Sequence, residues 1–329
     1  MAQMNGDSGL TLTVLGCGTM GVAILGGIMA SLTSPSKPQS YPASTAPSGT
    51  ATPTEELPPR LPSRFIACVR RPESLKKVRN ALSHYNVPFK ALVSDNLRGA
   101  QDADVVLLGC KPQMFRDILG QDGMREALAG KLLISILAGV TTEQLEEFLY
   151  GGVLSGQNFP PDRCRVVRAM PNTASLVRES MTVVATSTPP LDPAQAQLIN
   201  WIFTRIGRVV TLPPTAMDAS TALCGSGPAF MALVLEAIAD GAVAMGLPRA
   251  EAQMMAAQTM RGTTGLVLNG DHPAILRDKV STPGGCTIGG LLVLEEGGVR
   301  GAVARAVREA TVVAAQLGKG VTGVNGTRF

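Results

Sequence analysis

One stretch near the start of the chain constrains its fold more than any other part of the sequence. An apolar run at residues 12–15 ends in a glycine cluster, Gly16-Cys17-Gly18-Thr19-Met20-Gly21, and a second apolar run follows as far as residue 30. This order predicts a strand, a tight turn and a helix. In a dinucleotide-binding turn, the first glycine allows the turn, the second lets the backbone approach a pyrophosphate, and the third lets the helix lie close to the strand. An ordinary turn in a βα unit is the alternative interpretation.

Length and charge limit the class of protein. The chain of 329 residues, 45% of them hydrophobic, is long enough for two domains of roughly 150 residues each. The uncharged stretch 10–32 could cross a bilayer, which needs roughly 20 residues, but five glycines interrupt it and no basic segment precedes it. We therefore expect no membrane span, no signal peptide and a cytoplasmic protein. The net charge of +4 gives no reason to expect nucleic acid binding.

The cysteines and histidines lack the spacings of a metal site or a catalytic triad. The six cysteines form no CxxC pair, which favours reduced, buried thiols, and the two histidines, His84 and His272, lie in unrelated contexts. We expect no bound metal, and we expect the chemistry to depend on a cofactor.

A segment rich in Pro, Ser and Thr separates the first helix from the next strand. Its composition, over residues 33–63, cannot bury a core, so we interpret it as a mobile surface insertion. A strand is predicted at 65–69, followed by Arg70 and Arg71. Arg70 follows Gly21 by 49 positions, or by 18 when the 31 residues of the insertion are left out. Arginine at this strand end suits a 2′-phosphate and so indicates NADP, although a solvated basic helix start is the alternative.

Apolar runs alternate with helical patterns in the following segment. Strands are predicted at residues 87–93, 104–110, 132–137, 165–169, 181–185 and 209–212, and helices at 142–150 and 193–203. This alternation is typical of a parallel, doubly wound sheet, in which ligands bind at the carboxyl ends of the strands. Residues 16–21, 70–71, 110–112 and 137–138 all follow predicted strands, so we expect them to line one crevice. Asn172, in a loop after another strand, could hydrogen-bond a carboxamide or only shape a turn.

The pattern becomes helical from residue 218 onwards. A helix is predicted to begin at Ser226-Gly227-Pro228, and residues 228–245 carry only two charges. A helix that is apolar almost all round must be buried on almost all sides. We therefore predict an intertwined dimer, with a central helix in a monomeric bundle as the alternative. The expected domains are a dinucleotide-binding domain at 1–213 and a helical dimerisation and substrate domain at 214–329.

A second glycine cluster interrupts these helices. The segment Thr282-Pro283-Gly284-Gly285-Cys286-Thr287 precedes a helix predicted at 288–296. Free backbone N–H groups at a helix start bind anions, and the lack of an adjoining basic cluster favours a small carboxylate over a large phosphate. Thr287 adds a hydroxyl that can donate or accept a hydrogen bond. A plain capped helix turn is the alternative.

These motifs together resemble those of the pyrroline-5-carboxylate reductase family, in a fungal-like form with a Pro/Ser/Thr-rich insertion. The matching segments are 16–21, 110–113, 135–141, 169–173, 223–229, 246–249 and 279–288. The resemblance implies an α/β fold: a Rossmann-like, doubly wound N-terminal sheet followed by an all-helical dimerisation domain. It also implies the reduction of 1-pyrroline-5-carboxylate to L-proline by hydride transfer from NADPH, with NADH as an alternative donor. The dimers of this family often assemble further into rings.

The site residues follow from the motifs and from the resemblance. The expected cofactor-binding residues are Gly16, Cys17, Gly18, Thr19, Met20, Gly21, Arg70, Arg71, Asn96, Cys110, Lys111, Pro112, Leu137, Ala138 and Asn172. The expected substrate-binding residues are Lys279, Thr282, Gly284, Gly285, Cys286 and Thr287, from the helical domain of one of two paired subunits. Thr287 is the expected catalytic residue, because its hydroxyl would hydrogen-bond the ring nitrogen and orient the imine. No side chain is identified as a dedicated general acid.

Two other functions fit the same residues. A related imine or β-hydroxy-acid reductase would normally need a catalytic lysine in the helical domain, and Lys279 is the only lysine near the second glycine cluster. A non-catalytic NADPH sensor would need no carboxylate site, so the second cluster argues against it.

Overall fold

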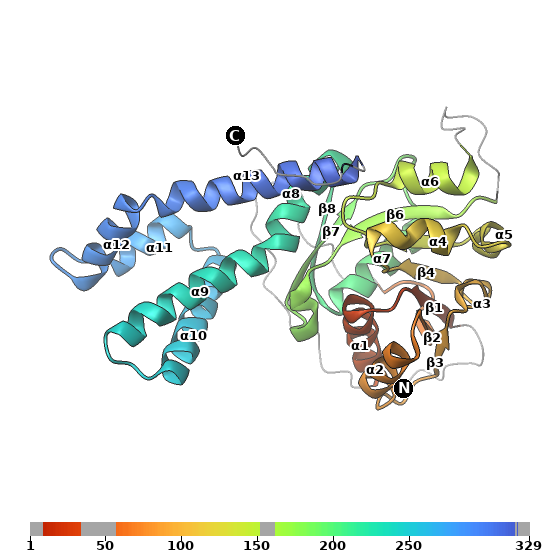
Figure 1. The fold of residues 1–329 in the computed structure, drawn as a ribbon, viewed down its shortest axis with the longest axis horizontal. Coiled ribbons are helices and arrows are strands. Elements are labelled where there is room, and N and C mark those ends of the chain that lie inside the picture. The colour runs from red at the N-terminus through yellow and green to blue at the C-terminus, as the bar shows by residue number, and fades with distance from the viewer. Residues whose placement is uncertain (1–8, 34–56, 152–161, 320, 322–329) are drawn as a thin grey trace.

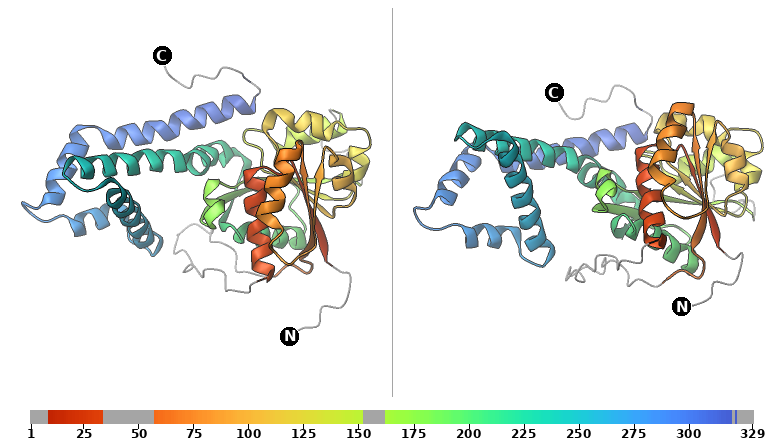
Figure 2. Two further views of the ribbon diagram at one scale, coloured as in Figure 1. Left: turned by 60° about the horizontal axis from the view of Figure 1, so that its bottom comes forward. Right: turned by 90° about the horizontal axis from the view of Figure 1, so that it is seen from below.

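The computed structural model describes residues 9–33, 57–151, 162–319 and 321. They form a sheet with helices on both faces and a long helical arm that extends away from it (Figures 1 and 2). The greater part of the predicted insertion, residues 34–56, lies outside the described residues. The predicted ends of the insertion are wrong, because Thr33 is the last residue of the first helix and Pro62 is the first residue of the second strand.

Strands and helices alternate along the first part of the chain. The strands are β1 (Leu10–Leu15), β2 (Pro62–Val69), β3 (Phe89–Val93), β4 (Val105–Leu108), β5 (Leu132–Ser135), β6 (Arg165–Met170), β7 (Ser180–Ala185) and β8 (Gly207–Leu212). The helices between them are α1 (Thr19–Thr33), α2 (Pro72–Leu82), α3 (Asn96–Gln101), η1 (Pro112–Met114), α4 (Phe115–Leu119), α5 (Met124–Leu128), α6 (Thr142–Tyr150), η2 (Thr173–Val177) and α7 (Pro193–Thr204). The predicted helix at 142–150 is confirmed in full by α6. Thr141 and Gln144 form a reciprocal capping box that fixes its start.

The eight strands form one sheet in the order β3-β2-β1-β4-β5-β6-β7-β8. The pairs from β3 to β6 are all parallel, which confirms the doubly wound arrangement. The expectation of a wholly parallel sheet is wrong at β7, which pairs antiparallel with β6 through Ala169–Val184 and Met170–Val183. A parallel pair needs a crossover of a dozen or more residues, and the short η2 connection between β6 and β7 does not provide one. The sheet is therefore mixed.

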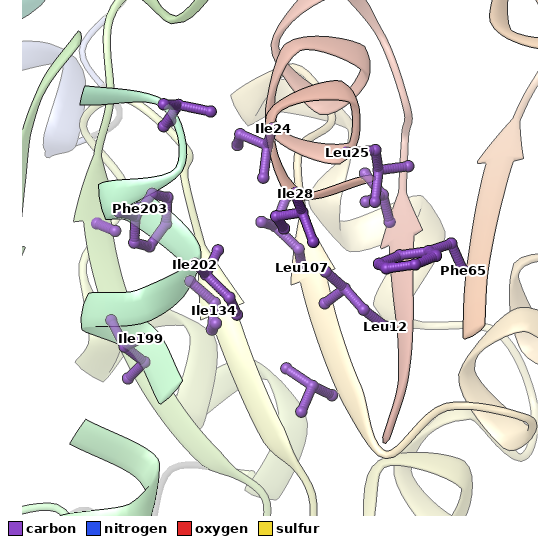
Figure 3. Packing of buried hydrophobic residues seen from close by; sticks show 14 of the residues in the cluster. Leu12, Ile24, Leu25, Ile28, Phe65, Leu107, Ile134, Ile199, Ile202 and Phe203 are labelled. Carbon is purple, nitrogen blue, oxygen red and sulfur yellow. The ribbon is translucent and has the colours of Figure 1, made fainter. Parts of the chain in front are cut away.

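Two apolar layers hold helices to the sheet. On one face, Leu12, Leu107 and Ile134 of the strands meet α1 and α7, which contribute Ile24, Ile28, Ile199, Ile202 and Phe203 (Figure 3). On the other face, a separate cluster joins the strands to α3, α4, α5 and α6. Each fully buried side chain of this size contributes about 1.5–3 kcal/mol. These layers fix the positions of the loops at the carboxyl ends of the strands.

The arm begins directly after β8. A short turn, η3 (Pro214–Ala216), leads into α8 (Met217–Ser220), a π-helical turn η4 (Thr221–Ser226) and α9 (Gly227–Ala244). Helix α9 begins at Gly227, with Ser226 as its N-cap and Pro228 in its first turn, so the predicted helix start at Ser226-Gly227-Pro228 is confirmed. The π-helical turn η4, which leads directly into this start, was not predicted.

Four further helices complete the arm. They are α10 (Arg249–Leu268), α11 (Pro273–Val280), α12 (Cys286–Glu296) and α13 (Val299–Gly318). Helix α10 packs against α9, and α13 returns along α8 and η4 to the sheet (Figure 1).

Most of the apolar surface of α9 stays uncovered in one chain. Its only fully buried residue is Ala239, whereas Leu233 is 67% exposed and Met231 and Ile238 are also exposed. The continuous helical run Pro214–Ala244 is long and apolar enough to span a bilayer by those two measures alone, and it is the only such run among the described residues. The uncovered surface calls for a covering partner.

Adjacent glycines of α1 provide a test of the packing. A Cβ atom on Gly27 would lie 2.6 Å from Ile206 Cγ2 and 2.9 Å from the carbonyl oxygen of Arg205, whereas a Cβ atom on Gly26 would meet nothing closer than 3.7 Å. We expect Gly27→Ala to lower the free energy of unfolding by about 1–3 kcal/mol through overpacking. Gly26→Ala is the matched control and should leave it unchanged or raise it by up to about 1 kcal/mol. Denaturant unfolding measures both, and equal effects would contradict the close approach of α1 to the turn before β8.

Candidate active site

The first glycine cluster joins three strand ends. Gly16 has a left-handed φ of 76°, and a Cβ atom on it would lie 2.6–2.8 Å from Cβ, Cα and N of Cys110 at the end of β4. The amides of Gly16 and Cys17 donate to the carbonyl oxygen of Cys68 in β2, at 3.1 and 2.8 Å. The turn after β1 is therefore fixed to both neighbouring strands, and only glycine fits at its first position.

The other two glycines of the cluster differ in their surroundings. A Cβ atom on Gly21 would lie 2.9 Å from Val14 Cγ1, so this glycine allows α1 to lie close to β1. A Cβ atom on Gly18 would meet no atom within 4 Å, and Gly18 and Thr19 are exposed. The first helical hydrogen bond runs from Val22 to Gly18, so the preceding amides of the first turn are free to bind an anion.

The two arginines at the end of β2 are exposed and face solvent. Within the described ranges, neither Arg70 nor Arg71 forms an ion pair. The backbone that carries them is held by Ser94, which has a positive φ of 52° and donates from its amide to Val69 and from its hydroxyl to the carbonyl oxygen of Arg70. The site therefore presents two uncompensated guanidinium groups on a fixed strand end.

The remaining predicted cofactor residues lie at neighbouring strand ends. Cys110, Lys111 and Pro112 follow β4, Leu137 and Ala138 follow β5, and Asn96 opens α3 after β3. The structure thus brings the residues predicted from five different strands to one edge of the sheet, at the carboxyl ends of β1–β5. We call this edge the cofactor edge.

The thiols at this edge are not nucleophiles. Burial raises the pKa of Cys17 and of Cys68 to about 12, and burial raises the pKa of Cys110 to about 11. All six cysteines are free, but the prediction of buried thiols is wrong for Cys286, which is exposed, and Cys110 and Cys224 are only partly buried. A thiol that stays protonated at neutral pH acts as an apolar packing group.

The side chain of Asn172 shapes a turn. It is buried, its Oδ1 accepts from the amide of Ala174 at 3.1 Å, and its Nδ2 donates to the carbonyl oxygen of Cys224 at 3.0 Å. Both polar atoms of this side chain are therefore engaged within the chain, which favours the turn-shaping alternative over a hydrogen bond to a carboxamide. Asn172 instead connects the loop after β6 to the π-helical turn of the arm.

The second glycine cluster forms the turn between α11 and α12. Gly284 has a φ of 68°, and a Cβ atom on Gly285 would lie 2.5 Å from Thr282 Oγ1. The amide of Gly285 donates to the carbonyl oxygen of Thr282 at 3.0 Å and is therefore already bonded. Helix α12 begins at Cys286, two residues before its predicted start. Its N-cap residue is Gly285, which has no side chain to form a capping hydrogen bond. Among the described residues no partner bonds the amides of Gly284, Cys286 or Thr287.

The charges beside this turn are already paired. Lys279 Nζ lies 2.8 Å from Asp271 Oδ1, and Arg277 Nη2 lies 2.9 Å from Asp278 Oδ1. The local positive charge is thus largely neutralised, which suits a small monoanion better than a large phosphate. A search of the described residues finds no group of His, Cys, Asp and Glu side chains that could hold a metal ion.

The two predicted half-sites are far apart within one chain. The α11–α12 turn lies towards the far end of the arm from the sheet in all three views (Figures 1 and 2). One chain therefore does not bring the α11–α12 turn to its own cofactor edge.

The sequence reasoning missed the residues that attach the arm to the sheet. Arg168 in β6 is buried and lies 3.7 Å from Asp218 in α8, measured from Nη2 to Oδ1. The signal was a charged residue, Arg168, inside the apolar part of a strand that also begins with Arg165. Ser94 was also missed, because a positive φ in a non-glycine residue leaves no pattern in the sequence.

Comparisons with known proteins agree with this arrangement. Residues 214–317 match the family described as pyrroline-5-carboxylate reductase dimerisation, and residues 48–139 match the family described as NADP oxidoreductase, coenzyme F420-dependent. Among relatives, the pyrroline-5-carboxylate reductase of Lophium arboricola is 64% identical over 98% of both chains. The pyrroline-5-carboxylate reductase of Neurospora crassa is 56% identical over 99% of this chain and 98% of the relative.

Solved structures show the same fold. The Coxiella burnetii pyrroline-5-carboxylate reductase has a TM-score of 0.72 at 27% identity, covering 94% of this chain and 99% of the other. The Plasmodium falciparum pyrroline carboxylate reductase with NADP bound has the same TM-score at 24% identity, covering 95% and 100%. With a Rossmann-like sheet, a helical dimerisation domain and relatives of this identity over their whole length, the chain belongs to the pyrroline-5-carboxylate reductase family.

Proposed function

We propose that the active site consists of the cofactor edge of one subunit and the α11–α12 turn of a second subunit. The reaction of this family is the NAD(P)H-dependent reduction of 1-pyrroline-5-carboxylate to L-proline, the last step of proline biosynthesis. The observation that carries the proposal is the turn itself, in which unbonded amides of Gly284, Cys286 and Thr287 adjoin a threonine hydroxyl. An exposed carboxylate-sized site of this kind has no use in a nucleotide sensor.

The cofactor edge fits NADPH. The open space at Gly18 and the free amides at the start of α1 suit a pyrophosphate. Arg70 and Arg71, which form no ion pair with any described residue, carry positive charge at the strand end that reads the adenosine ribose. Arginine binds a 2′-phosphate through two parallel hydrogen bonds. When bound, the cofactor supplies the hydride.

The chain's own residues hold and orient the imine. Amides at the start of α12 bind the carboxylate, where the helix dipole also favours a negative charge. The Thr287 hydroxyl hydrogen-bonds the ring nitrogen and so fixes which face of the imine is presented. Orientation of this kind lowers a barrier by up to about 7–11 kcal/mol in favourable cases. The Lys279 ammonium is engaged by Asp271, which does not favour the hydroxy-acid alternative.

A homodimer through the helical domain explains the uncovered helix. One chain leaves apolar residues of α9, α10 and α12 in solvent, and a second copy would cover them. The same pairing would place the α11–α12 turn of one subunit at the cofactor edge of the other. A higher ring of such dimers and a cytoplasmic location are consistent with the family resemblance and the free cysteines.

The arginine pair sets cofactor preference. We expect Arg70→Ala and Arg71→Ala each to raise KM for NADPH by about 10-fold or more, because a charge-assisted phosphate contact contributes about 1.5–3 kcal/mol. KM for NADH should stay unchanged, since NADH has no 2′-phosphate. Steady-state kinetics with both cofactors measure the difference, and equal increases would contradict the phosphate role.

The Thr287 hydroxyl acts in turnover. We expect Thr287→Ala to lower kcat by about 10–1,000-fold while the dissociation constant of NADPH stays unchanged. Thr287→Ser is the matched control, because it keeps the hydroxyl, and should retain most of the activity. Turnover of 1-pyrroline-5-carboxylate by Thr287→Ala at the wild-type rate would refute the assignment.

Mixed dimers test whether the site is shared between subunits. Gly18→Asp places a negative charge where the pyrophosphate is expected, in a position where the fold has open space. A heterodimer of one Gly18→Asp subunit and one Thr287→Ala subunit contains one intact site if the halves come from different chains. Purified through two different tags, this heterodimer should regain about half of the wild-type activity, whereas each variant homodimer keeps at most about a tenth of it. An inactive heterodimer would show that each site uses one chain.

A further inference from the structure

Three side chains of the sheet domain bind the root of the arm. Arg168 Nη2 lies 3.7 Å from Asp218 Oδ1, Asn172 Nδ2 donates to the carbonyl oxygen of Cys224 at 3.0 Å, and Gln144 Nε2 donates to the carbonyl oxygen of Gly318 at 2.6 Å. We call these the root contacts. Arg168 lies in β6, Asn172 follows β6, and Gln144 lies in α6, which follows β5. The predicted cofactor residues Leu137 and Ala138 also follow β5.

Arg168 is costly to bury and so needs an explanation. Its side chain is only 6% exposed, and its Nε and Nη2 atoms have no hydrogen-bond partner among the described residues. It sits in register with Ser135 of β5, in the interior of the sheet. Burial lowers the pKa of its guanidinium, and Asp218 and Glu143 oppose that shift. An apolar residue would pack here without a desolvation cost. We therefore interpret the Arg168 charge as fixing the position of Asp218 relative to the sheet.

The second root contact replaces a missing helical hydrogen bond. In an α-helix the carbonyl oxygen of Cys224 would accept from the amide of residue 228, but that residue is proline and has no N–H. The amide group of Asn172 donates to this carbonyl oxygen instead. The helix is therefore tied to the loop after β6 at the point where its own hydrogen bonding is interrupted.

The third root contact fixes the returning helix. Gly139, with a φ of 74°, lies so close to the end of α13 that a Cβ atom on it would be 3.2 Å from the amide nitrogen of Gly318. Gln144 donates to the carbonyl oxygen of Gly318. The arm thus leaves the sheet through α8 and returns through α13, and both ends are held beside the cofactor edge (Figure 1).

The length of the arm magnifies any change at its root. The helical run Pro214–Ala244 has 31 residues and is about 45 Å long at about 1.5 Å per residue. A rotation of one degree at the root moves its far end by about 0.8 Å. Reacting atoms must lie about 3–3.5 Å apart for transfer, and a misplacement of about 1 Å can cost about 100-fold in rate.

We infer that Arg168 is a positioning residue, which through Asp218 sets the angle between each sheet domain and the dimerised arms. That angle determines where the partner's substrate turn meets the cofactor edge. The inference rests on the proposed shared site. It assigns to the pair a role in hydride transfer and none in binding NADPH.

The test removes the charge from Asp218, the more exposed member of the ion pair. Asp218 is 38% exposed, and Asp218→Asn keeps its shape. We expect kcat to fall by about 10–100-fold, with the dissociation constant of NADPH from fluorescence titration within about twofold of wild type. The primary isotope effect with NADPH deuterated at the transferred hydrogen should rise, because transfer becomes rate-limiting. Asp218→Glu restores the charge and should recover much of kcat.

A matched control uses an ion pair that does not cross to the arm. Lys90 Nζ and Asp102 Oδ2 are also 3.7 Å apart but both belong to the sheet domain, so Asp102→Asn should leave kcat and the isotope effect unchanged. Wild-type kcat and isotope effect in Asp218→Asn would overturn the inference, as would an equal loss of NADPH binding. If Asp218→Asn does not fold, Arg168→Lys, which keeps the buried charge but loses the planar fork, carries the same test. Wild-type protein without imine-dependent NADPH oxidation would instead refute the proposed function.

Discussion

The apolar side chains of α9 lie on all sides of the helix, and one chain fully buries only Ala239 among them. A helix with this distribution is stable in water only when other helices surround it. The arm supplies α10 on one side and α13 near the root, and the remaining surface requires a second chain. In the proposed active site, assembly and completion of the site would be one event, since the contacts that cover α9 would also bring the α11–α12 turn to a cofactor edge.

The sheet domain does not share this dependence. Its two apolar layers are closed by α1 and α7 on one face and by α3–α6 on the other, all from the same chain. The turn at Gly16 is held by hydrogen bonds to β2 and by close packing on β4. The cofactor edge is thus formed within one chain, whereas in the proposed active site the α11–α12 turn would act only in a dimer. The root contacts join the sheet domain to the arm.

Much of this arrangement could be predicted from local sequence. The turn at Gly16, the close packing at Gly21 and the helix at 142–150 each depend on residues within a few positions, and all three were predicted. The reversal at β7 was missed because strand direction depends on the length of the connection and not on the apolar pattern. The helix start at Ser226-Gly227-Pro228 was predicted correctly, but the π-helical turn that leads into it was missed, because no local sequence pattern marks such a turn.

The contacts between distant residues could not be predicted in this way. Nothing in the sequence places Arg168 beside Asp218 or Asn172 beside Cys224, because these contacts depend on how the arm leaves the sheet. The separation of the two half-sites is likewise a property of the folded chain. The point at which the chain leaves α1 and enters β2 has a consequence for engineering the protein. Helix α1 runs away from the cofactor edge, and β2 runs towards it, so Thr33 and Pro62 both lie at the opposite side of the sheet. Natural variation in the length of the segment between them, or a reporter domain fused into it, would leave the geometry of catalysis undisturbed.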